Sequence, residues 1–441
     1  MADAPLSIAL FTYSTRPRGG VVHTLELAGA LAALGQRVRL FALEKPGRSG
    51  FFRPTSVPAS FIPVDERPDE EMGDRVTRYI DAYVGFLERE PGPGHGFDVY
   101  HAEDCISANA LIRLRAAGRL PWVVRTVHHV DDFTSPSLIS CQHDSIVGPD
   151  TILVVSDWWR RRLAEDYGID AQIVHNGVDL ERFRPALDDA AREAERAKVG
   201  LAGSAVVLAV GGVEPRKNSI VLLAAFAQAA PELAATTGRR PVLAIVGGDT
   251  LFDYRDYRTA FDLELERLVA GGQLEPGSVA RLGPVEEDRL QSLYRAADVL
   301  AFPSVKEGWG LAVLEAQASG TPVVASDIEV LREYLVDGRD ALLVAPDDPA
   351  ALSRAIVRAV AEPALAATLR AGGLATARRF DWQSTARRHL EIYRSLPGCS
   401  RGDGTDAPPA ADWGMGSKSL GPSDLRPSSP TIPRRGRPDS R

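Results

Sequence analysis

Two glutamates, Glu307 and Glu315, stand eight positions apart in the segment SVKEGWGLAVLEAQASG. Two carboxylates that lie roughly 5–10 Å apart can cleave a glycosidic bond. On one continuous helix, however, eight residues span about 12 Å, so the two groups could not cooperate in this way. Gly308 and Gly310 instead favour a loop before the helix. The segment therefore predicts a glycine loop with one glutamate, followed by a helix with the other.

Two further glycine loops carry residues that could bind an anion. Gly19 and Gly20 stand just before a predicted helix in YSTRPRGGVVHT, and VGGVEPRKNS places Arg216 and Lys217 between a strand and a helix. Free amides at a helix N-terminus and neighbouring cations both favour a diphosphate. A solvated cation pair on a turn would explain Arg216 and Lys217 equally well. The sequence contains neither the dinucleotide fingerprint nor the P-loop motif, which argues against dehydrogenases and P-loop NTPases.

His128 follows an apolar strand in VVRTVHHVDDF, with His129 beside it and Asp131 and Asp132 after it. These residue types can ligate a metal ion, but adjacent side chains diverge. The spacing is therefore poor for a metal site, and we expect none. A histidine at a strand end also has a purely structural explanation, which the spacing alone favours.

The elements that would position these residues follow one pattern, in which short apolar runs alternate with amphipathic helical stretches. This alternation is typical of a parallel sheet covered by helices. The expected strands of the first half are LSIALFTY, RVRLFAL, FDVYHA, WVVRTV, TILVVS and AQIVHN. Those of the second half are AVVLAV, PVLAIVGG, SVARLG, DVLAFP, TPVVAS and ALLVAP. The sequence therefore predicts an α/β protein with two tandem Rossmann-like domains.

The bulk composition limits the classes of function. The chain has 441 residues and a net charge of −8, which suits two domains and argues against a nucleic-acid binder. Its three cysteines lack metal-ligand spacing, and reduced thiols in the cytoplasm explain them most simply. We expect no signal peptide, and no membrane span because no apolar run approaches about 18 residues. The segment from about Pro397 is rich in Pro, Gly, Ser and Asp and predicts a disordered tail.

Taken together, the motifs resemble the retaining GT-B glycosyltransferases of family 4, which use nucleotide sugars. The resemblance covers about residues 6–396 and is carried by PRGGVVHTLELAGALAALGQRV, VHHVDD, VVSDWWRRRLAEDYG, HNGVDLERFRP, VGGVEPRKN and ADVLAFPSVKEGWGLAVLEAQASGTPVVASD. It implies two Rossmann-like domains that face each other across a cleft. The implied divisions are an acceptor domain (1–182), a linker (183–203), a donor domain (204–378), a helix that crosses back to the first domain (379–396) and the tail (397–441).

In the donor domain, the resemblance implies a role for each residue of the two motifs. Glu315 would bind both ribose hydroxyls of the donor nucleotide, and Glu307 would contact the hydroxyls of the sugar. Lys217, helped by Arg216, would neutralise the departing diphosphate. In the loop that contains Gly308, the backbone amides that would hold sugar and phosphate oxygens are those of Trp309, Gly310 and Leu311. Glu307 and Lys217 are thus the catalytic candidates of this domain.

In the acceptor domain, the resemblance implies that Gly19 and Gly20 let the backbone approach the phosphates. His128 would contact the donor sugar as the third catalytic candidate, with His129 as a rival for that role. The family commonly has Gly-Arg after the first strand of the donor domain, where this chain has Gly212, so Arg216 could supply the missing charge. Contacts with the acceptor would lie in the loop EKPGRSGFFRPTSVPASFIPVDERPDEEMG.

The implied activity is transfer of a hexosyl group, with retention, from a nucleotide diphosphate sugar to a hydroxyl acceptor. No metal, other cofactor or protein nucleophile is implied. The acceptor remains open among small molecules, oligosaccharides and lipid-linked compounds, as do the oligomeric state and peripheral membrane contact. We expect no nucleic-acid partner and a location in the cytoplasm or at the inner face of the membrane. Two alternatives are a nucleotide-sugar epimerase or hydrolase of the same fold, and a non-catalytic nucleotide-sugar-binding protein.

Overall fold

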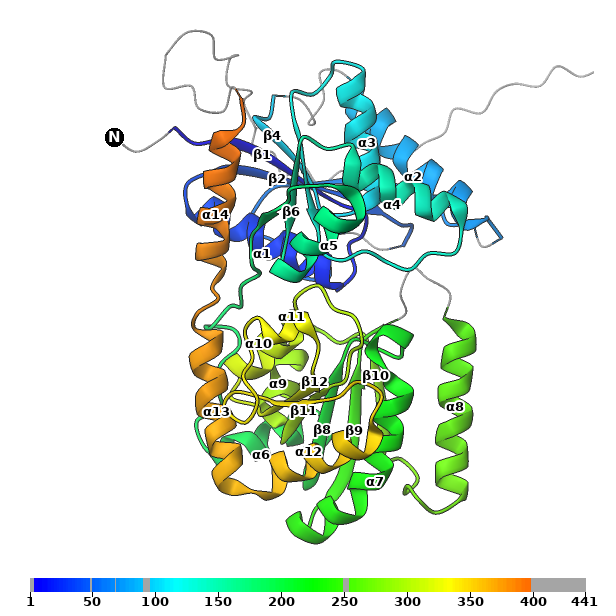
Figure 1. Ribbon diagram of the computed structural model, residues 1–441, viewed down its shortest axis with the longest axis vertical. Coiled ribbons are helices and arrows are strands. Elements are labelled where there is room, and N and C mark those ends of the chain that lie inside the picture. Colours follow the sequence, from blue (N-terminus) through cyan, green and yellow to red (C-terminus); the bar gives the residue numbers. More distant parts are fainter. Residues whose placement is uncertain (1–3, 48–49, 68, 90–95, 249–253, 398–441) are drawn as a thin grey trace, which may run out of the picture. The chain divides into compact units, whose positions relative to one another are not determined.

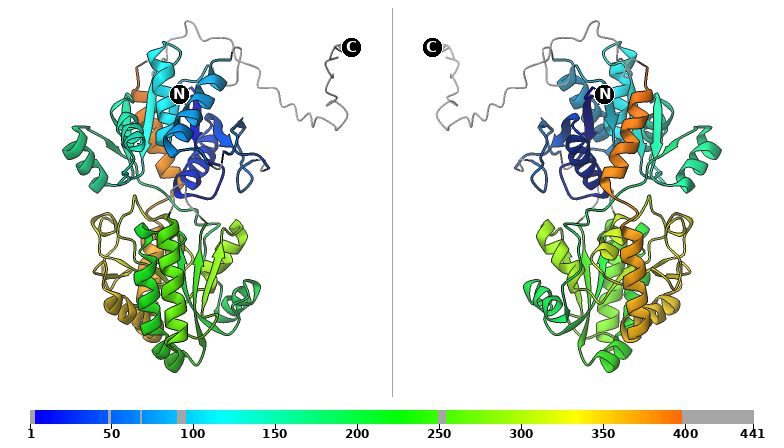
Figure 2. Two further views of the ribbon diagram at one scale, coloured as in Figure 1. Left: turned by 90° about the vertical axis from the view of Figure 1, so that its right-hand side faces the viewer. Right: turned by 90° about the vertical axis from the view of Figure 1, so that its left-hand side faces the viewer.

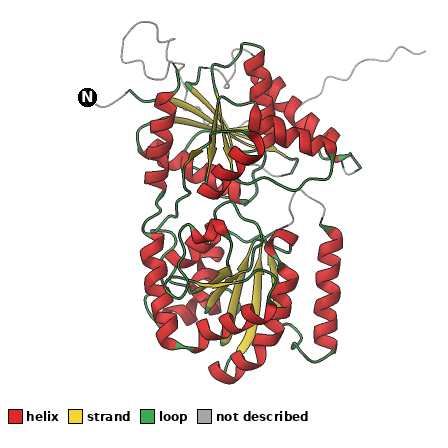
Figure 3. Cartoon of the chain, in the orientation of Figure 1, coloured by secondary structure: helices red, strands yellow, loops and turns green. Residues whose placement is uncertain are grey.

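Two parallel β-sheets, each with its own helices, carry the predicted functional residues (Figure 1). The computed structural model describes residues 4–47, 50–67, 69–89, 96–248 and 254–397. The tail predicted from residue 397 onward lies outside these residues, apart from Pro397. Helices lie on both sides of each sheet (Figure 3), so the predicted α/β fold class is confirmed.

The first sheet has seven parallel strands in the order β3-β2-β1-β4-β5-β6-β7. Their bounds are β1 (Ser7–Thr12), β2 (Arg37–Glu44), β3 (Ala59–Pro63), β4 (Val99–Ala102), β5 (Val123–Val127), β6 (Thr151–Val154) and β7 (Gln172–Ile173). All except β3 fall at predicted positions. Strand β3 lies inside the segment that was predicted to be the acceptor loop. That prediction is wrong for its five residues, Ala59–Pro63. An edge strand tolerates neighbouring prolines because one side of its backbone needs no partner, and those prolines obscured it.

The second sheet has six parallel strands in the order β10-β9-β8-β11-β12-β13. Their bounds are β8 (Ser204–Val210), β9 (Arg240–Val246), β10 (Val279–Gly283), β11 (Val299–Phe302), β12 (Val323–Ser326) and β13 (Leu342–Val344), all at predicted positions. In each sheet the strand order reverses beside the first strand, between β1 and β4 or between β8 and β11. Loops at such a switch point form the usual ligand site of an open parallel sheet.

The helices of the first half are α1 (Gly19–Ala33), α2 (Met72–Leu87), α3 (Cys105–Ala116), α4 (Pro136–Val147) and α5 (Asp157–Tyr167). Those that follow are α6 (Asp189–Lys198), α7 (Ser219–Thr237), α8 (Arg255–Ala270), α9 (Glu287–Ala296), α10 (Leu311–Ala318), α11 (Glu329–Arg332), α12 (Pro349–Ala361), α13 (Pro363–Ala377) and α14 (Trp382–Ser395). Helix α14 packs beside α1 on the first sheet (Figure 2), where Trp382 and Tyr393 join the core formed by Val21 and Leu25. The last helix of the chain thus contributes to the core of the first half.

Helix α6 lies inside the predicted linker (183–203) and packs against α9. The guanidinium group of Arg196 is buried and donates hydrogen bonds to the carbonyl oxygen of Ala296 and to Asp298. At least this part of the linker is therefore fixed to the second half. The boundaries of the divisions remain predictions.

One described segment, Pro215–Thr237, is long and apolar enough to cross a membrane by length and composition, contrary to the expectation that no such segment exists. In the structure, its residues Leu222, Leu223 and Phe226 are buried in the core beside β8 and β9. We interpret the segment as a core helix, because its apolar face is used to cover the second sheet.

Candidate active site

The loop between β11 and α10 has glycine where its backbone meets the first half. A Cβ atom on Gly308 would lie only 2.2 Å from the carbonyl oxygen of His128. Gly310, the N-cap of α10, has a φ of 97°, a left-handed conformation that favours glycine. Between them Trp309 is buried, and its ring stacks on His175 with centroids 4.5 Å apart. Backbone and side chain together therefore hold this loop against residues that follow strands of the first half.

Leu311, the first residue of α10, also packs against the core of the first half. The carbonyl oxygen of Glu307 accepts a hydrogen bond from Trp159 Nε1 at 2.9 Å. Glu333 accepts hydrogen bonds from the backbone amides of Asp157 and Trp158 at the start of α5. These contacts, which were not predicted from the sequence, fix the donor loop and the end of α11 to the first half.

Glu307 forms an ion-paired cluster with the two cations that precede α7. Lys217 Nζ donates to Glu307 Oε1 at 2.7 Å, and Arg216 Nη1 donates to the same oxygen at 3.0 Å. Burial would raise the pKa of Glu307, but the charges of Lys217 and Arg216 outweigh it and lower the pKa to about 2. Glu307 is therefore an anion at neutral pH and has no proton to donate. These three residues, predicted to share one site, are brought together by the structure.

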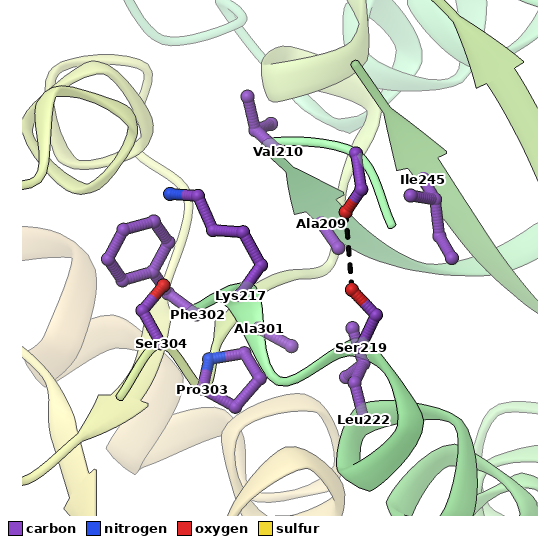
Figure 4. Close-up of a pocket in the computed structure, with 11 residues that line it drawn as sticks. Ala209, Val210, Lys217, Ser219, Leu222, Ile245, Ala301, Phe302, Pro303 and Ser304 are labelled. Atoms are coloured by element: carbon purple, nitrogen blue, oxygen red, sulfur yellow. Dashed lines mark hydrogen bonds between the residues drawn. The ribbon is translucent and has the colours of Figure 1, made fainter. Parts of the chain in front are cut away.

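A small pocket lies beside this cluster at the carboxyl ends of β8, β9 and β11 (Figure 4). Lys217 Nζ is 4.5 Å from the centroid of the Phe302 ring, and Ser219 Oγ donates to the carbonyl oxygen of Gly212 at 3.2 Å. A Cβ atom on Gly211 would meet the Lys217 side chain at 2.4 Å, so glycine makes room for the lysine. Gly212 has a φ of 79°, which disfavours any residue with a side chain. Gly212 therefore offers no side chain to replace the arginine that is common in the family, and Arg216 is a cation that lies nearby in the same loop.

Glu315 lies on α10 and has different partners from Glu307. Its Oε2 accepts a hydrogen bond from the hydroxyl group of Tyr294 at 2.7 Å. Burial raises the pKa of Glu315 to about 7, against the opposing effect of the hydrogen bond from Tyr294. In the described part of the chain, no hydrogen bond or ion pair joins Glu315 to Glu307. The two glutamates therefore have separate surroundings and opposite pKa shifts.

Of the two rival histidines, His128 and His129, it is His128 that lies beside the glycine loop of the first half. A Cβ atom on Gly20 would lie 3.6 Å from His128 Nε2, whereas a Cβ atom on Gly19 would have nothing within 4 Å. His129 Nε2 instead lies 3.3 Å from Asp131 Oδ1. Burial lowers the pKa of His128 to about 3, so its ring is neutral. The geometry thus favours His128 over its rival, and a side chain at Gly20 would make only ordinary van der Waals contact with its ring.

One group of described residues could hold a metal ion, because His23, Glu103 and His128 each place a ligand atom within 4.8 Å of the others. His128 Nε2 is 3.0 Å from Glu103 Oε2, and His23 Nε2 is 3.6 Å from Glu103 Oε1. Two imidazoles and a carboxylate are ligands that suit zinc. His23 and Glu103 were not among the residues predicted from the sequence. The available signal was the position of Glu103, directly after β4 at the switch point of the first sheet.

Comparison with known proteins identifies the architecture. The family model for glycosyltransferase family 4 matches residues 17–182, and that for glycosyl transferases group 1 matches residues 204–362. Sucrose-phosphate synthase from Thermosynechococcus elongatus superposes with a TM-score of 0.71 at 24% identity, over 89% of this chain and 99% of that chain. Anabaena HepE in complex with UDP-glucose superposes with a TM-score of 0.68 at 19% identity, over 89% and 100%. The fold is therefore that of the GT-B glycosyltransferases.

Two proteins with similar sequences show which glycosyltransferase family the chain belongs to. The D-inositol 3-phosphate glycosyltransferase of Streptomyces bingchenggensis is 30% identical over 425 residues, which are 88% of this chain and 89% of the relative. That of Frankia alni is 31% identical over 407 residues, which are 86% and 95% of the two chains. The chain belongs to the group 1 glycosyltransferases of family 4, and the predicted glycosyltransferase activity is confirmed at this level.

Proposed function

We propose that this glycosyltransferase moves a hexosyl group from a nucleotide diphosphate sugar to a hydroxyl acceptor, with retention of the anomeric configuration. The observation that carries the proposal is the cluster of Lys217, Arg216 and Glu307 at the switch point of the second sheet. Two cations and the free amides at the start of α10 provide electrostatic stabilisation for a departing diphosphate. These groups are in place before the reaction, so little reorganisation is needed.

The remaining residues have distinct roles in this proposal. Glu307 stays ionised, so it holds sugar hydroxyls and orients the two cations rather than transferring a proton. Glu315 accepts hydrogen bonds from the two ribose hydroxyls, while Tyr294 fixes one of its oxygens. His128 contacts the sugar from the first half. The departing diphosphate takes the proton of the acceptor hydroxyl.

The related proteins support particular substrates for testing. Structures of Anabaena HepE contain UDP, UDP-glucose, or UDP and glucose, which supports a UDP-sugar as the first donor to test. The names of the sequence relatives support D-inositol 3-phosphate as the first acceptor. Oligosaccharide and lipid-linked acceptors follow in the same assay.

We also propose that transfer needs no metal ion, because Lys217 and Arg216 supply two positive charges for the diphosphate. The proposed location is the cytoplasm or the inner face of its membrane. Cys105 and Cys141 are free thiols, which supports a reducing compartment.

The test begins with thermal unfolding of the purified full chain in the presence of UDP-, GDP- and ADP-sugars. The donor that stabilises the protein is then incubated with each acceptor, and the product is analysed by NMR for its anomeric configuration. We expect acceptor-dependent release of the nucleotide diphosphate, unchanged by EDTA, and a product with the configuration of the donor.

Each other outcome contradicts a specific part of the proposal. Release of nucleotide at the same rate without acceptor would indicate a hydrolase, and conversion of the donor sugar would indicate an epimerase. Stabilisation by a donor without turnover of any acceptor would indicate a binding protein. An inverted product would overturn retention alone.

A further inference from the structure

A buried polar cluster stands behind His128 in the first half. The side chain of Glu103 has no exposed surface, and its Oε2 lies 3.0 Å from His128 Nε2. Its other oxygen, Oε1, lies 3.6 Å from Nε2 of both His23 and His101. Within the described residues, Oε1 of Glu103 and Nε2 of His23 are buried and have no hydrogen-bond partner. Buried polar atoms of this kind are costly, so their juxtaposition needs a physical explanation.

The hydrogen bonds of His23 determine where its proton lies. Its Nδ1 is 2.9 Å from Oδ1 of Asn176, an oxygen that can only accept. Nδ1 therefore carries the proton, and Nε2 bears a lone pair that points toward Glu103. Two lone pairs 3.6 Å apart in a buried site repel each other unless a proton or another cation lies between them.

A proton on Glu103 removes this repulsion. The proton belongs on the carboxyl group, because His23 already donates from Nδ1 to Asn176 and a second proton would make its buried ring a cation. Burial acts in the same direction, since it raises the pKa of Glu103 to about 7 and lowers that of His23 to about 3. With Oε1 protonated, Oε2 remains as an acceptor, and His128 donates its Nε2–H to it. Nδ1 of His128 then carries a lone pair. The ring is 15% exposed, and Nδ1 has no partner in the described part of the chain, so it is available to a ligand.

We propose that Glu103 is a positioning residue for glycosyl transfer, whose neutral carboxyl group holds His128 in the Nε2–H tautomer so that Nδ1 accepts a hydrogen bond from a hydroxyl of the donor sugar. This inference rests on the proposed function, because it requires a donor sugar beside His128. His23 supports the arrangement by facing the proton on Oε1. The same geometry places His128, paired with Glu103, beside Gly20 of the glycine loop.

The surroundings of Glu103 contain charges of both signs. The titratable groups near it are His23 on α1, His101 on β4, Asp104 before α3, Arg125 on β5, His128 after β5 and Tyr393 on α14. Arg125 favours the ionised carboxylate and Asp104 opposes it, and burial outweighs both. A divalent metal ion between His23, Glu103 and His128 would also remove the repulsion, but it would require an ionised Glu103. The two explanations therefore predict different behaviour when the carboxyl group is replaced.

The first arm of the test compares Glu103→Gln with Glu103→Leu in the full chain. A glutamine amide reproduces a protonated carboxyl group, because its oxygen can accept from His128 while its NH₂ group donates to His23. We expect Glu103→Gln to keep kcat within about threefold, whereas Glu103→Leu lowers kcat at least about tenfold because the hydrogen bond to His128 is lost. Equal losses in the two variants would overturn the proposal, and so would a fully active Glu103→Leu. Thermal unfolding shows whether each variant is folded.

The second arm measures the tautomer of His128 directly. In protein labelled with ¹⁵N-histidine, the signals of His128 are assigned by their loss in His128→Gln, and the ¹⁵N shifts report which ring nitrogen carries the proton. We expect the Nε2–H form in the wild type and in Glu103→Gln, and a mixture or the Nδ1–H form in Glu103→Leu. His143→Gln is the control, because His143 is exposed on α4, where its Nδ1 pairs with Asp144. An unchanged tautomer in Glu103→Leu would overturn the proposal.

Metal analysis distinguishes a protonated Glu103 from a metal ion bound between His23, Glu103 and His128. Elemental analysis of the purified protein should find divalent metal well below one ion per chain, before and after incubation with zinc and dialysis. A stoichiometric metal that disappears in Glu103→Gln would overturn the neutral carboxyl group. The arms also separate this inference from the proposed function. Absence of turnover in the wild type would refute the proposed function, while the tautomer measurement would still decide the role of Glu103. An active Glu103→Leu with an unchanged tautomer of His128 would refute the inference alone.

Discussion

The two halves of the candidate site each bury a glutamate, and the pKa values of the two carboxyl groups are shifted in opposite directions. In the second half, Glu307 is ionised because Lys217 and Arg216 contact the same oxygen. In the first half, Glu103 is surrounded mainly by neutral imidazoles, and burial raises its pKa to about 7. Ion pairs stabilise a buried charge, whereas neutral rings do not. In the proposed function, this difference suits the cations of the second half to the diphosphate of the donor, and the neutral ring of His128 in the first half to a hydroxyl group of its sugar.

Removing a cation from the second half should have the largest effect. We expect Lys217→Ala to lower kcat by about 10³-fold, since the charge that stabilises the departing diphosphate is lost in a buried site. Steady-state kinetics with the identified donor and acceptor measure this change, and the donor KM should rise as well. The result would tie catalysis to the charged half of the site.

Two variants control for less specific effects of this change. Lys217→Arg keeps the charge and should recover part of the lost kcat. Lys198→Ala removes an exposed lysine on α6 that pairs with Glu195, and it should leave kcat unchanged. Wild-type turnover in a folded Lys217→Ala would show that the ion-paired cluster has no part in the reaction.

The contact between the two halves should be next in importance. The Cβ atom of Gly308→Ala would press on the carbonyl oxygen of His128, a backbone atom that cannot move without shifting the end of β5. We expect kcat to fall by about 10²-fold, because small displacements of reacting groups are costly. Gly85→Ala in α2 is the matched control, since its Cβ atom would have nothing within 4 Å. If kcat is the same for both variants, the charged and neutral clusters work without this close approach.

Much of the fold and part of the site were accessible from the sequence. Continuous apolar runs predicted twelve strands, and the resemblance to family 4 implied that Glu307, Lys217 and Arg216 share one site. The position of Glu103 after an apolar strand was visible in the sequence, but its approach to His23 was not, since that depends on β4 lying between β1 and β5 in the sheet. Nor does a sequence show which oxygen of Glu103 lacks a partner. Charged residues in glycine loops can be recognised in a sequence, whereas the contacts between buried groups such as Glu103 and His23 can be recognised only in the packed structure.

A smaller effect should arise from the titration of Glu315. Its pKa of about 7 lies above the ordinary value of 4.5, so the stability that its neutral form contributes is present below pH 4.5 and is lost as the pH rises through 7. The ionised form accepts ribose hydroxyls better, so the donor Kd should fall about fivefold between pH 6 and 8. Calorimetry of donor binding measures this, and Glu315→Gln should bind weakly with a flatter pH profile. A wild-type Kd that rises over this range would contradict the assignment of Glu315 to the ribose.

The smallest effect is expected for Trp309→Phe. This variant distinguishes the contribution of the Trp309 side chain from that of the backbone of the donor loop. The indole ring of Trp309 stacks on His175, and phenylalanine can keep this contact. Nε1 of Trp309 is buried and has no hydrogen-bond partner among the residues that the structure describes, so its removal offsets part of the lost packing. We expect the free energy of unfolding to change by less than about 1.5 kcal/mol and kcat by less than about threefold. Chemical denaturation and steady-state kinetics check both values. A loss as large as that of Gly308→Ala would mean that packing of the ring on His175, and not only the glycine contact with His128, joins the charged half of the site to the neutral one.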